Sequence, residues 1–149
     1  MILTCHLLAA AAVASKISNP FLAVPLAFLS HYFLDFPPQQ EYDISNIKER
    51  RWQKSFFDFF KVFLDISIGM LLIFFFSKNT PLIFAAAFLA IVPDFLTLLA
   101  LIFPKNKLLV KHHIFHRAIN NISENKKIPL FWGIFSQAIV IFIAIFLLQ

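Results

Sequence analysis

Long apolar stretches limit what this chain can fold into more than any other feature of its sequence. Four of them cover residues 20–36, 55–77, 81–103 and 128–148. A helix needs about 20 apolar residues to cross the hydrocarbon core of a bilayer, and each stretch is close to that length. A fifth stretch, residues 2–17, is shorter. We interpret it as a retained short helix, although its Ala-rich end also resembles a signal-peptide cleavage site.

The fold class follows from these stretches, because a single segment inside lipid satisfies its own backbone hydrogen bonds only as a helix. We predict an all-α, polytopic membrane bundle of about five hydrophobic helices, forming one domain over residues 1–149. Composition agrees, since 60% of the residues are apolar and 14% are charged, with a mean hydropathy of +0.78. Soluble domains carry about 25% charged residues. The aromatic content of 17% excludes a disordered chain, and the single Cys5 excludes an internal disulfide.

Basic residues concentrate in two polar connections, residues 39–54 and 105–127, which hold 10 of the 13 Lys and Arg side chains. In a five-helix arrangement both connections lie on the same side as the N-terminus. The positive-inside rule then predicts two cytoplasmic basic loops, with the N-terminus inside and the C-terminus outside. This placement explains the net charge of +5 without nucleic acid as a partner. The lipid bilayer is the predicted partner, and the oligomeric state stays open.

Ionisable side chains inside apolar helices are costly and require a reason. The predicted helices contain His6, His31, Asp35, Asp58, Lys61, Asp65 and Asp94, and the second connection adds His112, His113 and His116. Under the predicted topology all of these gather in the cytoplasmic half of the protein.

Spacing places several of these residues on shared faces. His31 and Asp35 are four residues apart, and so are His112 and His116, which would share a face if that segment were helical. Pro93 should kink its helix immediately before Asp94. Asp65 lies on one stripe with Gly69, which would let a neighbouring helix approach closely.

Imidazole and carboxylate groups at these spacings suit a divalent metal ion, with zinc favoured and manganese or iron as alternatives. Simpler interpretations stay open. His31 and Asp35 could form a hydrogen-bonded pair, Asp94 could cap the broken helix, and Asp58 could pair locally with Lys61. His6 alone could be an interfacial side chain.

Short motifs in the chain resemble a known family. They are Thr4-Cys5-His6-Leu7-Leu8, the segment from Ser30-His31 through Asp35 to Pro37-Pro38, Val92-Pro93-Asp94, and the late pair His112 and His116. Together they resemble the membrane-bound metal-dependent hydrolases that include the LexA-regulated inner-membrane proteins of bacteria. That family is distantly similar to zinc-dependent phospholipase C and P1 nuclease.

The resemblance implies a bacterial inner-membrane location and a ligand set of His6, His31, Asp35, Asp94 and His116. One departure is that Gln39 and Gln40 stand where the family usually has a His after Asp-x-x-Pro. An amide oxygen is a poor zinc ligand, so fewer ions, weaker binding or lost catalysis all stay open.

The predicted function is a membrane-embedded metal-dependent hydrolase with a cytoplasm-facing site, acting on a phosphoester or lipid-related substrate. A divalent ion would activate water, and Asp65 or His112 could serve as general base. Substrate charge would be held by Lys61, Lys111 and Arg117. The alternative is a non-enzymatic membrane protein, either an ion or proton transporter or a degenerate hydrolase that binds a partner.

Overall fold

The computed structural model describes residues 1–37, 42–124 and 129–149, with side chains left out of the description at 121–124. Within these ranges the chain is entirely helical, which confirms the all-α class. The eight α-helices are α1 (Leu3–Lys16), α2 (Pro20–Asp35), α3 (Ser45–Lys48), α4 (Phe56–Phe76), α5 (Pro81–Ala90), α6 (Val92–Ile102), α7 (Lys107–Glu124) and α8 (Leu130–Leu148). A short 3-10 helix, η1 (Trp52–Lys54), precedes α4.

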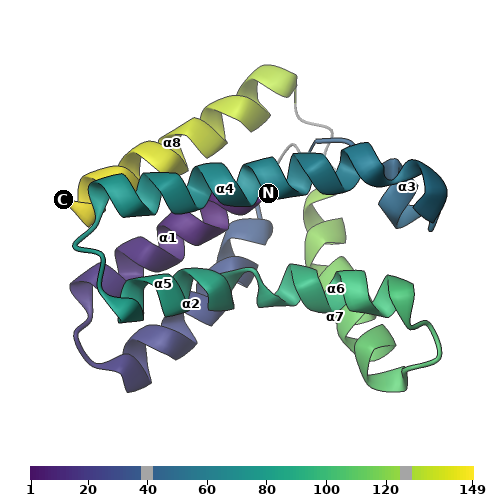
Figure 1. Cartoon of the computed structure of the whole chain (residues 1–149), viewed down its shortest axis with the longest axis horizontal. Coiled ribbons are helices and arrows are strands. Elements are labelled where there is room, and N and C mark those ends of the chain that lie inside the picture. The colour runs from purple at the N-terminus through teal and green to yellow at the C-terminus, as the bar shows by residue number, and fades with distance from the viewer. Residues whose placement is uncertain (38–41, 125–128) are drawn as a thin grey trace.

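Helix α1 lies at the centre of the bundle and packs against α2, α4, α5 and α8 (Figure 1). Its buried alanines, among them Ala10 and Ala11, let neighbouring helices approach closely. Gly69 of α4 allows a close approach between α4 and α1. A Cβ atom there would lie 2.6 Å from Leu7 Cδ1 and 3.2 Å from Thr4 Cα. The close helix approach predicted at Gly69 is therefore confirmed.

In the described part of the chain two helices, α4 and α8, are long and apolar enough to cross a membrane. The bent pair α5 and α6 is a third candidate if it counts as one span, whereas α1 and α2 are shorter apolar helices. The outer face of α4 carries Phe57, Phe63 and Phe75, which are 64–73% exposed and therefore available to lipid. These two or three candidates support a membrane protein. The five-span arrangement and its orientation stay predictions.

The predicted kink before Asp94 is confirmed as a break between two helices. Helix α5 ends at Ala90, Ile91 separates the helices, and α6 starts at Val92 with an angle of 43° between them. Pro93 lies in the first turn of α6, where its missing N–H group costs no intrahelical hydrogen bond. The stretch at 81–103 is thus two helices rather than one, and Asp94 lies in the first turn of the second.

The second basic connection differs from the loop that its polar composition suggested. Residues Lys107–Glu124 form α7, which packs against α6 and α2 (Figure 1). The first connection also contains helical turns, α3 and η1. Helix α7 matters for function because it delivers His116 to the interior, where this side chain is buried.

Candidate metal centre

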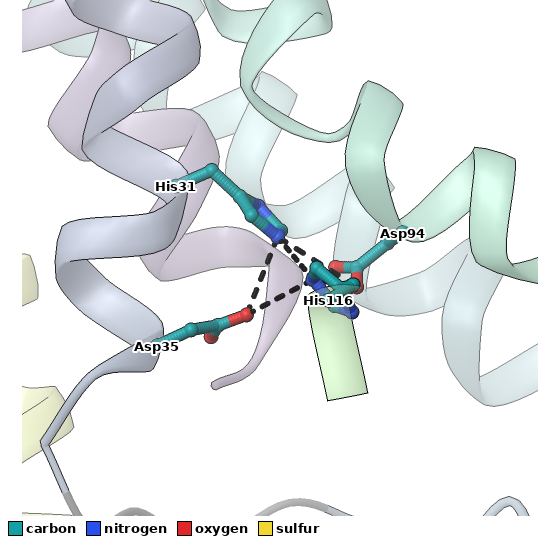
Figure 2. Close-up of side chains that lie close together, drawn as sticks. All are labelled: His31, Asp35, Asp94 and His116. Atoms are coloured by element: carbon teal, nitrogen blue, oxygen red, sulfur yellow. Dashed lines mark hydrogen bonds and ion pairs between the residues drawn. The ribbon is translucent and has the colours of Figure 1, made fainter. Parts of the chain in front are cut away.

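Four side chains from three helices converge at one point beside the centre of the bundle (Figure 2). Helix α2 supplies His31 and Asp35 from adjacent turns of its last part, so the four-residue spacing places both on one face. Helix α6 supplies Asp94, and α7 supplies His116. One ligand atom from each residue lies within 4.8 Å of the other three.

The distances between these atoms match a metal coordination sphere. The two Nε2 atoms of His31 and His116 are 2.8 Å apart, and each lies 3.3 Å from Asp35 Oδ2. Asp94 Oδ1 lies 3.6 Å from His116 Nε2 and 3.9 Å from His31 Nε2. Donors bound about 2.0–2.1 Å from a tetrahedral zinc ion are about 3.3–3.4 Å from each other. The four donors lie within 4.8 Å of one another, so they could surround one ion once the 2.8 Å pair separates and the longer distances shorten.

Burial makes a cation at this point energetically valuable. His31, Asp35 and His116 are buried, and the Asp94 side chain is 34% exposed. Asp35 contacts the amino group of Met1, and a divalent ion would add positive charge that the more exposed carboxylate of Asp94 also shares. A set of two imidazoles and two carboxylates suits zinc, with manganese or iron as alternatives. The residues present fit a divalent metal ion, whose identity stays open.

The partners of the cluster residues orient them. Thr97, one turn after Asp94 on α6, places its Oγ1 atom 3.5 Å from His116 Nδ1. That contact turns Nε2 of His116 toward the cluster, as a second contact to a metal-binding imidazole usually does. Thr97 was missed in the sequence, although its three-residue spacing from Asp94 was a usable signal. The buried Nδ1 atom of His31 has no hydrogen-bond partner in the described part of the chain.

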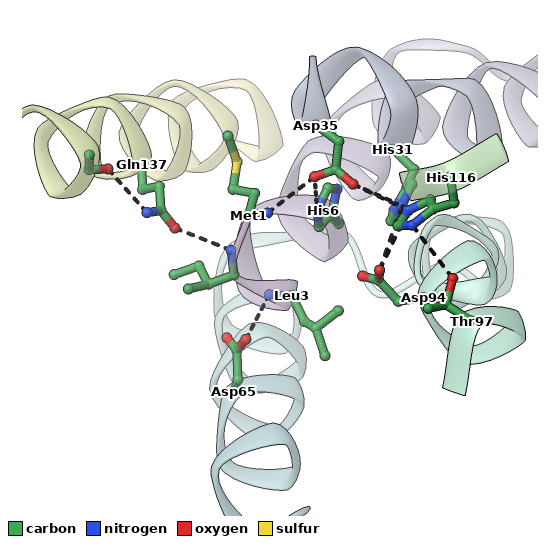
Figure 3. Close-up of polar contacts among 12 residues, drawn as sticks. Met1, Leu3, His6, His31, Asp35, Asp65, Asp94, Thr97, His116 and Gln137 are labelled. Atoms are coloured by element: carbon green, nitrogen blue, oxygen red, sulfur yellow. Dashed lines mark hydrogen bonds and ion pairs between the residues drawn. The ribbon is translucent and has the colours of Figure 1, made fainter. Parts of the chain in front are cut away.

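His6 lies behind Asp35, outside the group of four (Figure 3). Its Nε2 atom is 3.2 Å from Asp35 Oδ1, the oxygen that also contacts the amino group of Met1 at 3.1 Å. The ring of His6 stacks on that of His31, with centroids 4.3 Å apart. In this arrangement His6 touches two members of the cluster. Its own role as a ligand stays a prediction.

Asp65 belongs to α4, and its side chain contacts the first residues of α1, away from the group of four (Figure 3). Its carboxylate accepts hydrogen bonds from Leu3 N at 2.6 Å, Thr4 N at 3.0 Å and Thr4 Oγ1 at 2.6 Å. These are contacts of a helix N-terminal cap, satisfying amides that have no intrahelical partner. The contacts give Asp65 a structural position, and its role as general base stays an untested prediction.

Two other predicted site residues, Lys61 and His112, have partners outside the group of four. Lys61 Nζ donates to Asp43 O at 2.7 Å and lies 3.9 Å from Asp58 Oδ1, as the local ion-pair interpretation expected. His112 Nε2 lies 3.3 Å from the Tyr32 hydroxyl oxygen. Burial, followed by the charge of neighbouring His116, lowers the pKa of His112.

A cavity of about 600 Å³ opens beside the cluster, and Asp94 and His116 form part of its wall. His113 and Arg117 of α7 also line it, whereas Lys61, Lys111 and His112 do not. Burial and the charge of Arg117 lower the pKa of His113. Of the three predicted substrate-binding cations, the structure therefore brings only Arg117 to this cavity.

Comparison with known proteins gives no further assignment: no family model, curated protein or solved structure matches the chain. The family resemblance therefore rests on the short motifs, three of which supply His31, Asp35, Asp94 and His116 to one cluster. The departure at Gln39 and Gln40 lies outside the described residues.

Proposed function

We propose that this protein is a membrane-embedded, metal-dependent hydrolase of phosphoesters, with its site facing the cytoplasm of a bacterium. The observation that carries the proposal is the convergence of His31, Asp35, Asp94 and His116 beside a cavity. A purely structural polar cluster needs no such cavity. Two of the four residues, Asp94 and His116, contribute both to the cluster and to the cavity wall, so a ligand in the cavity would meet an ion held there.

The residues of the cluster and of the cavity wall would have different roles in hydrolysis. A divalent ion in the cluster would act as a Lewis acid on the phosphoryl group and on water. Asp35 and His31 hold the buried side of the cluster, while Asp94 lies at its more exposed side. Arg117 would bind phosphate oxygens through its planar guanidinium group.

Proton transfer is the remaining requirement, and His113 is better placed for it than His112 because it lines the cavity. Its lowered pKa keeps the imidazole neutral at pH 7, the form that accepts a proton. In hydrolysis a water oxygen bonds to phosphorus as the ester P–O bond breaks. The proton removed from that water ends on the leaving alcohol, and His113 would take it up and return it.

Metal content of the purified protein tests this proposal. We expect about one divalent ion per chain in the wild type, and less than one tenth of that content in His31→Ala and Asp94→Ala. His112→Ala and Asp58→Ala are matched controls, since both remove a titratable side chain outside the group of four and should keep the metal. Absence of stoichiometric metal from gently purified wild type, or unchanged metal in both cluster variants, would contradict the proposal.

Catalysis requires its own measurement. We expect the metal-loaded wild type to release phosphate or alcohol from members of a phosphomonoester and phosphodiester panel. His113→Gln should lower the turnover by about 100-fold, within the range of a lost general base, while retaining metal. A metal-containing protein that hydrolyses no member of the panel would favour the non-enzymatic alternative.

One observation favours a second candidate function, ion transport. The break between α5 and α6, with its angle of 43°, brings Asp94 to the start of a discontinuous helix. Discontinuous helices in transporters form ion sites of this kind. Uptake of zinc or protons into proteoliposomes, abolished by Asp94→Ala, would support transport. Phosphoester turnover without flux would exclude it.

A further inference from the structure

The cavity beside the cluster has two chemically different walls. Toward α7 it is bordered by His113, His116 and Arg117, with Asp94 of α6 beside them. Toward α4 and α6 it is bordered by Phe59, Val62, Ile66, Leu98 and Leu101. A ligand with a polar group at one end and an apolar group at the other would match both sets of side chains.

The polar wall is suited to an anion. Among the residues that the structure describes, Arg117 forms no ion pair, so its guanidinium group is available to a ligand. Lys48 also lines the cavity and adds positive charge, whereas Glu49 and Asp94 add negative charge, so the preference for an anion depends on Arg117. An arginine without a protein partner beside a mainly apolar space favours phosphate, which it binds through two parallel hydrogen bonds.

Part of the apolar lining comes from a helix that is a candidate membrane span. Phe59 and Val62 belong to α4, a candidate membrane span whose outer face exposes large apolar side chains. A hydrocarbon chain placed along this wall would contact α4 and α6, and the contacting part of the chain would be removed from water. Each methylene group that leaves water adds to the affinity, so a short length of buried chain should tighten binding severalfold.

We propose that the cavity binds a single-chain amphiphile with a terminal phosphate, such as a lysophosphatidate. The phosphate would lie beside Arg117, and the chain would lie along Val62 and Leu98. The volume of about 600 Å³ is that of a site for a drug-sized ligand, which encloses a head group and part of one chain. Hydrolysis of the bound phosphoester rests on the proposed function, whereas binding of the amphiphile can be measured separately.

Equilibrium binding to protein in nanodiscs tests the amphiphile assignment. The probes are an oleoyl lysophosphatidate, glycerol 3-phosphate and oleate, which respectively carry both features, the phosphate alone and the chain alone. We expect the lysophosphatidate to bind about 100-fold more tightly than glycerol 3-phosphate, because the chain is buried. Oleate should bind at least about 10-fold more weakly than the lysophosphatidate, because a phosphate offers more charge and more acceptor oxygens to Arg117.

Two variants locate the two ends of the ligand. Arg117→Gln should weaken lysophosphatidate binding by about 10-fold or more, the effect of a lost charge-assisted hydrogen bond. Lys111→Gln, a loss of the same charge from the same helix but outside the cavity, should change binding less than twofold. Leu98→Trp should fill the space beside the apolar wall. It should weaken lysophosphatidate binding and leave the binding of glycerol 3-phosphate unchanged. Leu108→Trp, at an exposed position on α7, is its control.

The outcomes separate this inference from the proposed function. Equal affinity for lysophosphatidate and glycerol 3-phosphate, or equal effects of Arg117→Gln and Lys111→Gln, would overturn the amphiphile assignment even if metal is bound. Equal binding of oleate would overturn the assignment of phosphate. Selective lysophosphatidate binding in a preparation that holds no metal would confirm the amphiphile assignment, and it would contradict the hydrolase proposal.

Discussion

The carboxylate of Asp65 offers a quantitative test of how this protein is held together. It accepts three hydrogen bonds from the first residues of α1, two from the backbone of Leu3 and Thr4 and one from the Thr4 hydroxyl group. Thr4 is buried, so Asp65→Ala would leave at least one amide without a partner in the interior. Loss of an N-cap costs up to about 2 kcal/mol, and an unsatisfied buried amide costs about 1–3 kcal/mol.

We therefore expect Asp65→Ala to lower the free energy of unfolding by about 2–4 kcal/mol. Asp65→Asn should cost less, because one amide oxygen still accepts a hydrogen bond. Reversible unfolding in mixed micelles, followed by the signal of α-helix circular dichroism, would measure both. Ser67→Ala is the matched control on α4, since the Ser67 hydroxyl group bonds to Phe63 O of its own helix.

Metal content should be measured on the same samples. The capping role predicts that folded Asp65→Asn retains the wild-type amount of metal. A variant with wild-type stability and lost metal would refute this reasoning, because Asp65 would then act as a ligand. Destabilisation of Asp65→Ala below about 0.5 kcal/mol, the usual effect of a neutral surface substitution, would also refute it.

Three further predictions follow from the packing and the site. Gly69→Ala should destabilise the protein by about 1–3 kcal/mol in the same unfolding assay, because the new methyl group would lie 3.2 Å from the fixed Thr4 Cα. Unchanged stability would contradict the close approach of α1 and α4. NMR titration of the metal-free protein should give His113 a pKa below its ordinary 6.5, and Arg117→Gln should raise that pKa because a neighbouring cation opposes protonation. A pKa at or above 6.5 in the wild type would contradict a partly buried imidazole next to Arg117. Metal at about 1,000 times its dissociation constant should stabilise the fold by about 4 kcal/mol in thermal unfolding; the same shift in His31→Ala would show that the ion binds elsewhere.

The parts of the site that the sequence could predict were those encoded by local spacing. The four-residue interval between His31 and Asp35 places both on one helical face wherever the helix goes. Pro93 disfavours a continuous helix and suits the first turn of a new one, because its ring fixes φ and its backbone nitrogen carries no hydrogen. Apolar composition likewise identified α4 and α8 as candidate spans. Each of these inferences depends on neighbours in sequence.

Tertiary placement could not be predicted in this way. Asp65 appears equivalent to Asp94 as a titratable residue in an apolar stretch, and only the arrival of α1 at α4 makes it a cap. The segment that forms α7 is rich in Lys, His and Asn, so it resembles a loop until its buried face packs against α2 and α6. The distinction between His112 and His113 depends on the rotation of that helix, which the spacing alone does not specify.

X-ray absorption spectroscopy of the zinc-loaded protein tests the central claim most directly, because it reports the atoms bound to the ion. The four-residue cluster predicts nitrogen and oxygen neighbours at about 2.0–2.2 Å, with the multiple-scattering signal of two imidazoles. His31→Ala should remove one imidazole contribution or the ion itself. A sulfur neighbour at about 2.3 Å, which would implicate Cys5, or a spectrum unchanged in His31→Ala would contradict the claim that His31, Asp35, Asp94 and His116 form a metal centre.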